Sequence, residues 1–377
     1  MPAPDLTAAT LRANPAYELV PFAQLPPGEQ RALHALTRDA DFYGILRPRD
    51  AASRLGVKSV CRETALLFDT LREPGGLPGY LRPASEEVCA ELWRLLLDGV
   101  LELRVDDGYV SGPAAHGMAA ASGDPPATGR IARLSVAAVR YGQALELSNT
   151  RRLSEKLYSY GRQPLSPHWI RTLGDPDLVA RHLGLHRGVP HREWIAAAGG
   201  TGPDPWLRWA RRGAPAHGAG LAKLYVSVVC ADVGSALRVT AALAAGSSAA
   251  FLKVGGDPAA LLRPDKLMVY FWNLDDLREF ACALSGELAG CGVQGVPFTA
   301  ELAGDGLLSW GMDPPPDESV PAWLGQESWR LWITNRLAVA LTGARAAAEP
   351  WLFALDRLRL DGVDTGSWTP IGAGAAQ

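Results

Sequence analysis

Three short segments between residues 223 and 271 each combine a lysine with alternating apolar residues. Successive side chains of a strand point to opposite faces, so each segment predicts a strand with one aliphatic face and one lysine-bearing face. If the three strands pair, their lysines converge on one surface. Cations beside aromatic rings suit a phosphate dianion, so the pattern predicts a phosphate site. The cations concerned are Lys223, Lys253, Lys266 and the nearby Arg263.

These residues also have ordinary structural interpretations. A lysine in a strand is usually solvated, with its stem along the apolar surface. Tyr225 can be a ring that covers the core, and Lys266 a surface cation. Asp265 can simply pair with a nearby arginine, which contributes little at a surface. A lysine becomes a base only where burial or neighbouring cations lower its pKa, so the pattern alone leaves both interpretations open.

The composition is that of a globular protein. With 377 residues, 47% of them hydrophobic, the chain can bury a sizeable core in two or three domains. A net charge of -3 gives no global case for binding nucleic acid or a membrane. Charge is unevenly distributed, because residues 151–212 hold 11 Lys or Arg against 5 Asp or Glu, and residues 1–125 hold 12 against 17. A basic segment thus precedes the lysine strands.

Cysteine and histidine spacing indicates neither a disulfide framework nor a metal site. The five cysteines are an odd number without a C-x-x-C spacing. His182, His186 and His191 lack a carboxylate or thiol that would complete a ligand set. The chain begins without a secretory apolar run and has no apolar stretch of membrane-spanning length. We therefore expect a cytoplasmic protein without a metal site.

The N-terminal third predicts helices followed by a hairpin. Helical patterns cover residues 28–38, where Gly44 and Pro48 then act as stop signals, and residues 62–71. Ser85 is a good N-cap for the clearest helix, and residues 101–110 alternate around a turn. This order is typical of a winged-helix module, and residues 1–125 could hold a leader peptide along a strand edge. DNA binding is a less favoured function for this region, because the region is acidic. A domain with a purely structural role is as well supported as either function.

The rest of the chain, residues 130–377, predicts an α+β domain with its core at 221–345. Residues 130–160 are mainly helical, and the segment that follows favours a basic loop in which Trp206 and Trp209 could stack on a peptide. The predicted order after that segment is strand, helix, strand, strand, helix, with Asp232 and Asn273 as the helix caps. A hairpin at 296–310 and helices from about 328 and 350 complete the domain.

Four motifs together resemble the HopA effector-like family. They are the lysine strands, Arg-Pro-Asp-Lys-Leu-x-x-Tyr-Phe, Gln-Gly-Val-Pro-Phe-Thr-Ala-Glu-Leu and Ser-Trp-Arg-Leu-Trp-Ile-Thr-Asn-Arg-Leu. Members of that family occur in class V lanthipeptide and thioamitide clusters, where they are taken to be lyases that pair with a separate kinase. The resemblance covers about residues 130–345. The strand motifs alone also resemble bacterial phosphothreonine lyases and the lyase domain of class III lanthipeptide synthetases.

The resemblance implies β-elimination of phosphate from phosphoserine or phosphothreonine, a reaction that needs no metal or organic cofactor. Lys253 lies where the family has its base, which removes the α-proton. The resemblance implies phosphate-binding roles for Lys223, Arg263, Lys266 and Arg336, and substrate-binding roles for Tyr270, Thr299 and Glu301.

This chain differs from the phosphothreonine lyases at the position of the general acid. Those enzymes place a histidine two residues after the first lysine, where this chain has Tyr225. A tyrosine can donate a proton, and we expect nearby cations to lower its pKa. His168, His217 and Glu301 are alternatives for the acid.

These observations predict a lyase that forms dehydroalanine or dehydrobutyrine in a ribosomally made precursor peptide, with a kinase as partner. The basic segment 151–212 would attract the phosphorylated peptide. The alternative is a non-catalytic protein of the same pathway that binds the peptide or scaffolds the kinase. Closure of thioether rings is a third possibility, but the chain has no zinc-site signal for it.

Overall fold

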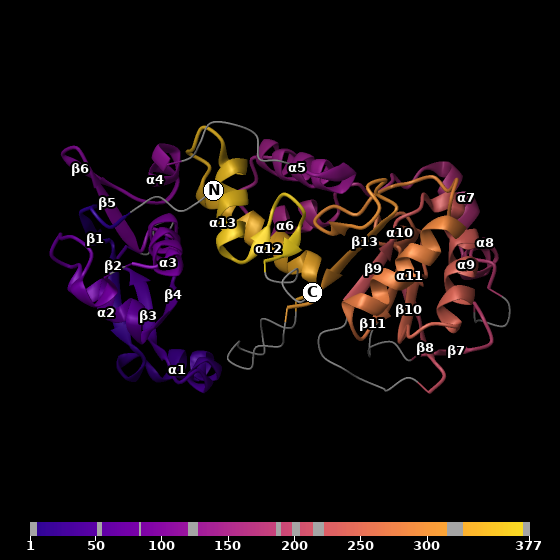
Figure 1. The fold of residues 1–377 in the computed structure, drawn as a ribbon, viewed down its shortest axis with the longest axis horizontal. Coiled ribbons are helices and arrows are strands. Elements are labelled where there is room, and N and C mark those ends of the chain that lie inside the picture. Colours follow the sequence, from indigo (N-terminus) through magenta and orange to yellow (C-terminus); the bar gives the residue numbers. More distant parts are fainter. Residues whose placement is uncertain are drawn as a thin grey trace. The chain divides into compact units, whose positions relative to one another are not determined.

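The structure is a computed structural model that describes residues 6–50, 55–82, 84–119, 127–185, 190–197, 204–213, 222–314 and 327–371. The chain divides into two compact units (Figure 1). We call residues 6–119 with 339–361 the N-terminal unit, and residues 127–314 with 327–338 and 362–371 the C-terminal unit. Both helices and strands are present in each unit, so the α+β class is confirmed.

The N-terminal unit contains two three-stranded antiparallel sheets, with strand orders β2-β3-β4 and β1-β5-β6. Helices follow or flank the strands (Figure 1). The elements are β1 (Leu11–Ala13), β2 (Tyr17–Pro21), α1 (Pro27–Leu33), β3 (Phe42–Pro48), β4 (Lys58–Cys61), α2 (Arg62–Thr70), α3 (Glu86–Leu97), β5 (Leu101–Val105), β6 (Gly108–Val110), α4 (Gly112–Ala119) and α13 (Pro350–Leu360).

Several sequence expectations for this unit are confirmed. The helix over 62–71 is α2, and Ser85 caps α3 by accepting a hydrogen bond from the Val88 N–H. The hairpin over 101–110 is β5 and β6. The expected order of helix, helix and hairpin is therefore present, and a winged-helix module that holds a leader peptide stays a prediction.

Residues 42–48 differ from the expectation, because they form strand β3 between β2 and β4. The sequence analysis treated Gly44 as a stop signal. In the structure, a Cβ atom at Gly44 would lie 2.3 Å from the Val20 carbonyl oxygen. Gly44 thus permits β2 to approach β3 closely, next to a register shift in the pairing of β3 with β4.

The C-terminal unit is built on a seven-stranded sheet of order β12-β13-β9-β11-β10-β8-β7, in which every pair is antiparallel. The three lysine-bearing strands pair as predicted, with β11 between β9 and β10. The strands are β7 (Trp194–Ala196), β8 (Trp206–Arg211), β9 (Ala222–Val226), β10 (Phe251–Gly255), β11 (Leu267–Phe271), β12 (Ala300–Glu301) and β13 (Leu308–Met312), with the separate pair β14 (Val363–Asp364) and β15 (Thr369–Pro370).

One face of this sheet forms the main core. Its aliphatic side chains pack with two helices, α9 and α11, which lie against the sheet in Figure 1. Leu224, Leu252 and Val269 are fully buried there, which confirms the predicted aliphatic face. The helices of the unit are α5 (Gly129–Ala144), α6 (Thr150–Tyr158), α7 (Pro167–Leu173), α8 (Pro176–His182), α9 (Val233–Ala245), α10 (Pro258–Leu261), α11 (Leu274–Glu287) and the first ten residues of α12 (Trp329–Gly343).

The two predicted caps have different outcomes. Asn273 caps α11, since its side chain accepts a hydrogen bond from the Asp276 N–H. Asp232 does not cap α9 through its side chain, so that expectation is wrong. Its Oδ2 atom instead accepts a hydrogen bond from the Gly292 N–H at 2.7 Å, because a short 3-10 turn leads into α9 and turns the carboxylate away.

The basic segment contributes strands as well as loops. Residues 206–211, which were expected in a basic loop, form β8 beside β10.

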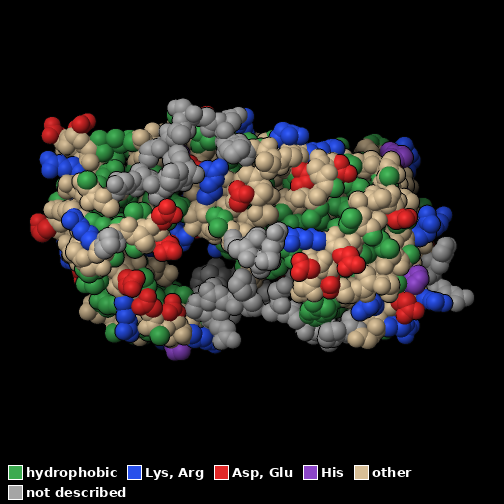
Figure 2. Space-filling model, viewed as in Figure 1, with side chains coloured by type: hydrophobic (Ala, Val, Ile, Leu, Met, Phe, Trp, Pro, Cys, Tyr) green, Lys and Arg blue, Asp and Glu red, His purple; other side chains and the backbone are tan. Residues whose placement is uncertain are grey.

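Figure 2 shows acidic and basic side chains interspersed on the described part of the visible face. In the described ranges no helix combines the length and apolarity needed to cross a bilayer.

Candidate active site

The register of the sheet aligns the candidate residues on the face opposite the main core. Lys253 on β10 lies opposite Arg208 on β8 and Met268 on β11, and Met268 lies opposite Tyr225 on β9. Neighbouring strands are about 4.8 Å apart, so strands β10 and β9 are separated by about 10 Å. Lys253 and Tyr225 therefore lie on either side of Met268 on the same face of the sheet, where Tyr225 and Met268 are buried beside Val296.

Lys253 is the central cation of this face. Its Nζ atom lies 4.2 Å from the centroid of the Trp206 ring. Burial, followed by the neighbouring charges of Arg208 and Lys223, lowers the pKa of Lys253 to about 8, against an opposing effect of nearby aspartates. The described residues offer its amine no hydrogen bond or ion pair. Lys253 is thus a partly buried amine that is free to accept a proton.

Arg263 lies beside Lys253 and is held by a carboxylate. Its Cζ atom is 5.0 Å from the centroid of the same Trp206 ring. It donates two hydrogen bonds of 2.8 Å to Asp265 and one of 3.0 Å to the Tyr158 hydroxyl. The fork geometry fixes the guanidinium plane, so Arg263 is oriented in advance of any ligand.

Asp265 binds a second arginine, Arg330, which the sequence analysis did not select. Arg330 is 1% exposed and donates a 2.7 Å hydrogen bond to Asp265. Its other donors reach the carbonyls of Pro297 at 3.1 Å and Tyr158 at 2.8 Å. Burial opposes ionisation of Asp265, but Arg330 and Arg263 outweigh it and hold the pKa of that carboxyl well below its usual range. The predicted arginine pairing of Asp265 is present, in the interior rather than at the surface.

Lys223 faces the same side of the sheet and pairs with Asp313. Its Nζ atom lies 5.5 Å from the centroid of the Tyr270 ring. The side chain of Lys223 is 11% exposed. A phosphate would therefore meet an ammonium group that already has a carboxylate partner.

Lys266 lies in a different environment from Lys253. It is fully buried, and its Nζ atom donates to the Val228 carbonyl and to Gln294 Oε1, both at 2.6 Å. Burial lowers its pKa to about 8, while Cys230 acts in the opposite direction. Phosphate binding by Lys266 would require these bonds to break, so that role stays a prediction and we leave Lys266 out of the site proposed below.

The two tyrosines of the site are buried. Burial raises the pKa of Tyr225 well above its ordinary value of 10.0, although Arg330 acts in the opposite direction. The expected lowering by a nearby cation is therefore present, but burial outweighs it and the net shift is upward. Burial likewise raises the pKa of Tyr270, whose hydroxyl lies 3.8 Å from Met268 Sδ. Both hydroxyls stay protonated at neutral pH, so either can donate a proton but neither can act as a base there.

The predicted substrate-binding residues Thr299 and Glu301 have contacts within the protein. Thr299 is fully buried, and its hydroxyl hydrogen bonds to the Val296 carbonyl at 2.6 Å and Ser309 Oγ at 2.8 Å. Glu301 Oε2 accepts a 3.1 Å hydrogen bond from the Ile131 N–H in the first turn of α5. Carboxylates are favourable at helix N-termini. Substrate contact by either residue stays a prediction.

The remaining candidates have their contacts with residues other than Lys253, Met268 and Tyr225. Arg336 stacks on Trp332, with Cζ 3.8 Å from the ring centroid, and contacts Glu327 at 3.2 Å. The ring of His168 packs against Trp169 at a centroid distance of 4.8 Å. His217 lies outside the described residues. The structure thus brings Lys253, Arg263, Lys223, Tyr225 and Tyr270 to one face.

Sequence reasoning missed three contributors to this face. Arg208 comes from β8, which was not predicted, and pairs with Asp204 at 2.7 Å. Tyr158 ends α6 and contacts Arg263. Arg330 lies between two tryptophans in the Ser-Trp-Arg-Leu-Trp motif, and this position was the sequence feature that could have identified it.

In the part of the chain that the structure describes, no group of three His, Cys, Asp or Glu side chains is arranged to hold a metal ion.

No protein-family model and no curated protein sequence matches the chain. Among solved structures, effector proteins from Pseudomonas syringae pv. syringae strain 61 and pv. tomato strain DC3000 are 15% and 12% identical, with TM-scores of 0.42 and 0.41. Each match covers 64% of this chain and 99% or 98% of the other. The phosphothreonine lyase effector VirA (SpvC) from Chromobacterium violaceum is 15% identical, with a TM-score of 0.29, over 47% of this chain and 86% of that chain. At these scores the likenesses identify neither the family nor the activity, and membership of the HopA effector-like family stays a prediction.

Proposed function

We propose that the C-terminal unit is a lyase that removes phosphate from phosphoserine or phosphothreonine in a peptide. The neutral amine of Lys253 takes the α-proton. The electrons of the Cα–H bond form the Cα=Cβ double bond, the Cβ–O bond breaks, and its electrons leave with the phosphate. An acid protonates the departing oxygen. The products are a dehydroalanine or dehydrobutyrine residue and inorganic phosphate. The protonated lysine then gives its proton to water, and the acid regains one from water.

Lys253 carries this proposal. General bases work best when their pKa is near the working pH, and burial together with neighbouring cations brings the Lys253 pKa to about 8. At neutral pH roughly a tenth of such amines are neutral, whereas an unperturbed lysine is almost wholly charged. The absence of a carboxylate partner among the described residues keeps the amine available.

The surrounding cations support phosphate binding. Five cationic side chains of the described face, Lys223, Lys253, Arg208, Arg263 and Arg330, are accompanied by the three carboxylates Asp204, Asp265 and Asp313. The cluster keeps a positive surplus even when Lys253 is neutral. A dianion in this partly buried space is attracted more strongly than it would be in water.

Tyr225 is our candidate for the acid. Its raised pKa keeps the proton on the hydroxyl until charge develops on the leaving oxygen. Because it lies one strand beyond Met268 from Lys253, a substrate lying across Met268 would have the base on one side and this donor on the other. The α-proton and the leaving oxygen are on adjacent carbons, which fits this placement.

The substrate we propose is a ribosomally made precursor peptide of a lanthipeptide-type pathway, phosphorylated by a separate kinase in the cytoplasm. The basic segment 151–212 supports attraction of the phosphorylated peptide. The N-terminal unit would hold the leader of that peptide.

Mass spectrometry of a phosphorylated peptide incubated with the protein alone tests the lyase. We expect loss of phosphoric acid with the unaltered protein and no loss with Lys253→Ala. Arg238→Ala, a change at an exposed arginine of α9 on the core side of the sheet, is the control and should keep full activity. An unchanged phosphopeptide with the unaltered protein, or equal turnover by Lys253→Ala, would contradict the proposal.

A second candidate function is phosphopeptide binding without turnover, as a peptide chaperone or kinase scaffold. The observation that favours it is that burial raises the pKa of Tyr225 well above its ordinary value, which makes this residue a weak acid for the leaving oxygen. Isothermal titration calorimetry distinguishes the two. Tight binding of an intact phosphopeptide that Lys253→Ala leaves unchanged would favour the scaffold.

A further inference from the structure

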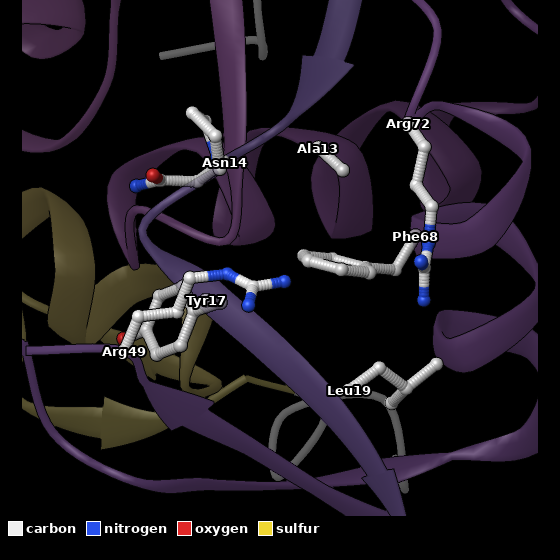
Figure 3. Close-up of a pocket in the computed structure, with 8 residues that line it drawn as sticks. Ala13, Asn14, Tyr17, Leu19, Arg49, Phe68 and Arg72 are labelled. Carbon is white, nitrogen blue, oxygen red and sulfur yellow. The ribbon is translucent and has the colours of Figure 1, made fainter.

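A cavity of about 310 Å³ lies in the N-terminal unit, between strand β2 and helix α2. Tyr17 and Leu19 of β2 line one side, and Phe68 of α2 and Arg72, which follows α2, line the other (Figure 3). Arg49, which follows β3, completes the lining. In Figure 3 its guanidinium points into the space toward the Phe68 ring. The cavity thus combines a cation with an aromatic wall.

The two arginines of the cavity differ in how they are paired. Arg72 contacts Asp69, near the end of α2, at 2.7 Å, and both side chains are more than half exposed. The described residues provide the Arg49 guanidinium with no hydrogen-bond or ion-pair partner. Arg49 is therefore the cation available to a ligand. A guanidinium binds a carboxylate with two parallel hydrogen bonds.

Strand β2 lies at the edge of its sheet, and the outward backbone groups of Leu19 have no backbone partner among the described residues. The Arg49 N–H donates a 2.8 Å hydrogen bond to the Ala16 carbonyl, which sets the alternation of the antiparallel ladder. By that alternation, Glu18 and Val20 direct their backbone groups toward β3. The N–H and C=O of Leu19 then point outward, and they have no backbone partner among the described residues.

We propose that this edge and cavity together bind an extended peptide segment that carries an acidic side chain. The segment would pair with β2 through the Leu19 N–H and C=O, as an added strand. A side chain on the face that α2 covers would then enter the cavity, where an aspartate or glutamate meets Arg49. Next-but-one residues of the segment point to the same face and would contact Phe68 and Leu19. The ligand is thus an acidic residue flanked at two-residue spacing by apolar ones.

Charge favours such a peptide over a polyanion. Residues 1–125 carry 12 basic and 17 acidic side chains, so the region as a whole repels nucleic acid and anionic lipid surfaces. A single carboxylate needs only the local cation at the cavity. This inference deepens the proposed holding of a leader peptide by the N-terminal unit, and it concerns binding alone, so it can fail while the lyase proposal stands.

The first test is selection from a random heptapeptide display library with the full chain as bait. We expect enrichment of Asp or Glu at one position with apolar residues two positions away. Arg49→Glu as bait should abolish that enrichment. Arg47→Glu is the matched control, because Arg47 lies two residues away on β3 and pairs with Glu29 instead. Enrichment of nothing, or of sequences without an acidic residue, would overturn the proposal.

The second test measures binding of one enriched peptide, carrying a fluorescent label, by anisotropy. Arg49→Ala should weaken binding about 10- to 100-fold, and Arg47→Ala less than twofold. Peptides methylated on alternate backbone nitrogens test the added strand without altering the protein. Methylation at one parity should abolish binding, and methylation at the other should not. Equal effects of both parities, or full affinity of Arg49→Ala, would overturn the proposal.

Discussion

The Nζ atom of Lys253 lies 4.2 Å from the centroid of the Trp206 ring, on the sheet face opposite the main core. The ring favours the charged amine through cation–π attraction, while burial and Arg208 favour the neutral one. The net effect favours the neutral amine relative to an ordinary lysine, since the Lys253 pKa is lowered to about 8. Lys253 can therefore change its charge within the working range of an enzyme.

The first prediction is that activity depends on pH through Lys253. The base must be neutral, and its neutral fraction rises about tenfold per pH unit below the pKa. We therefore expect kcat/KM for elimination to increase as pH rises to about 8 and to level off above it. Initial rates measured by phosphate release between pH 6 and 9.5 test this.

The control for this prediction is Lys253→Arg, whose guanidinium keeps its charge over the whole range. We expect its activity to be lower by about 10²- to 10⁴-fold, the usual contribution of a general base, without the rise toward pH 8. A rise of the same shape in Lys253→Arg would show that another group titrates.

The second prediction concerns Asp265 and the free energy of unfolding. Asp265→Asn leaves the buried Arg330 without its carboxylate, so we expect a loss of about 3–5 kcal/mol. Urea denaturation followed by tryptophan fluorescence measures it. Glu155→Gln breaks an exposed ion pair with Arg151 on α6, and it should change the free energy of unfolding by less than about 0.5 kcal/mol.

The sign of the pH dependence follows from the depressed pKa of Asp265. Its stabilising contribution is fully present above the unfolded-state pKa of about 3.9 and is lost as pH falls toward the lower pKa of the folded state. The difference in stability between the unaltered chain and Asp265→Asn should therefore shrink in acid below about pH 4. A difference that stays constant into acid would contradict this assignment.

Local patterns sufficed for much of the fold. The alternation around Lys253 predicted the strand and its two faces, and Ser85 and Asn273 were recognised as caps because their hydrogen bonds close within three residues. Strand β3 was not predicted, because the role of Gly44 depends on the approach of β2, which the local pattern does not contain.

The candidate site was less accessible from the sequence, because its contacts join distant segments. Lys223 meets Asp313 across 90 residues, and Asp265 meets Arg330 across 65. No spacing rule links such pairs. The burial of Lys266 could not be predicted from the sequence either, because the exposure of a lysine beside a strand depends on the segments that cover it. Here the Lys266 amine is bonded to the Val228 carbonyl and Gln294, which come from distant segments.

The third prediction is that Asp313→Asn strengthens phosphopeptide binding. The change removes the negative charge that Lys223 now faces, while the amide oxygen can still accept the Trp329 N–H at the start of α12. We expect KM to fall by about tenfold, since a hydrogen bond to a charged group contributes about 1.5 kcal/mol. Steady-state kinetics with the phosphopeptide measure it. A KM that rises would show that Asp313 positions Lys223 rather than neutralising it.

The fourth prediction concerns Lys266, whose folded-state pKa is lowered to about 8 by burial. An unfolded lysine titrates near 10.4, so between about pH 8 and 10.4 the unfolded chain holds a proton that the folded chain has lost. Stability rises with pH wherever the unfolded state binds more protons. We therefore expect Lys266 to add a rise on the order of 3 kcal/mol in the free energy of unfolding across this interval.

Lys266→Met tests this prediction through the slope of the free energy of unfolding against pH, rather than through the free energy of unfolding at one pH. The methionine leaves the Val228 carbonyl and Gln294 without their donor, so some stability is lost at every pH. Urea denaturation at several values from pH 7 to 10 should nevertheless show a flatter rise in the variant than in the unaltered chain. Because Lys253 titrates in the same interval, Lys253→Met provides the comparison. An unchanged slope in Lys266→Met would show that Lys266 stays charged in the folded protein, held by its two acceptors.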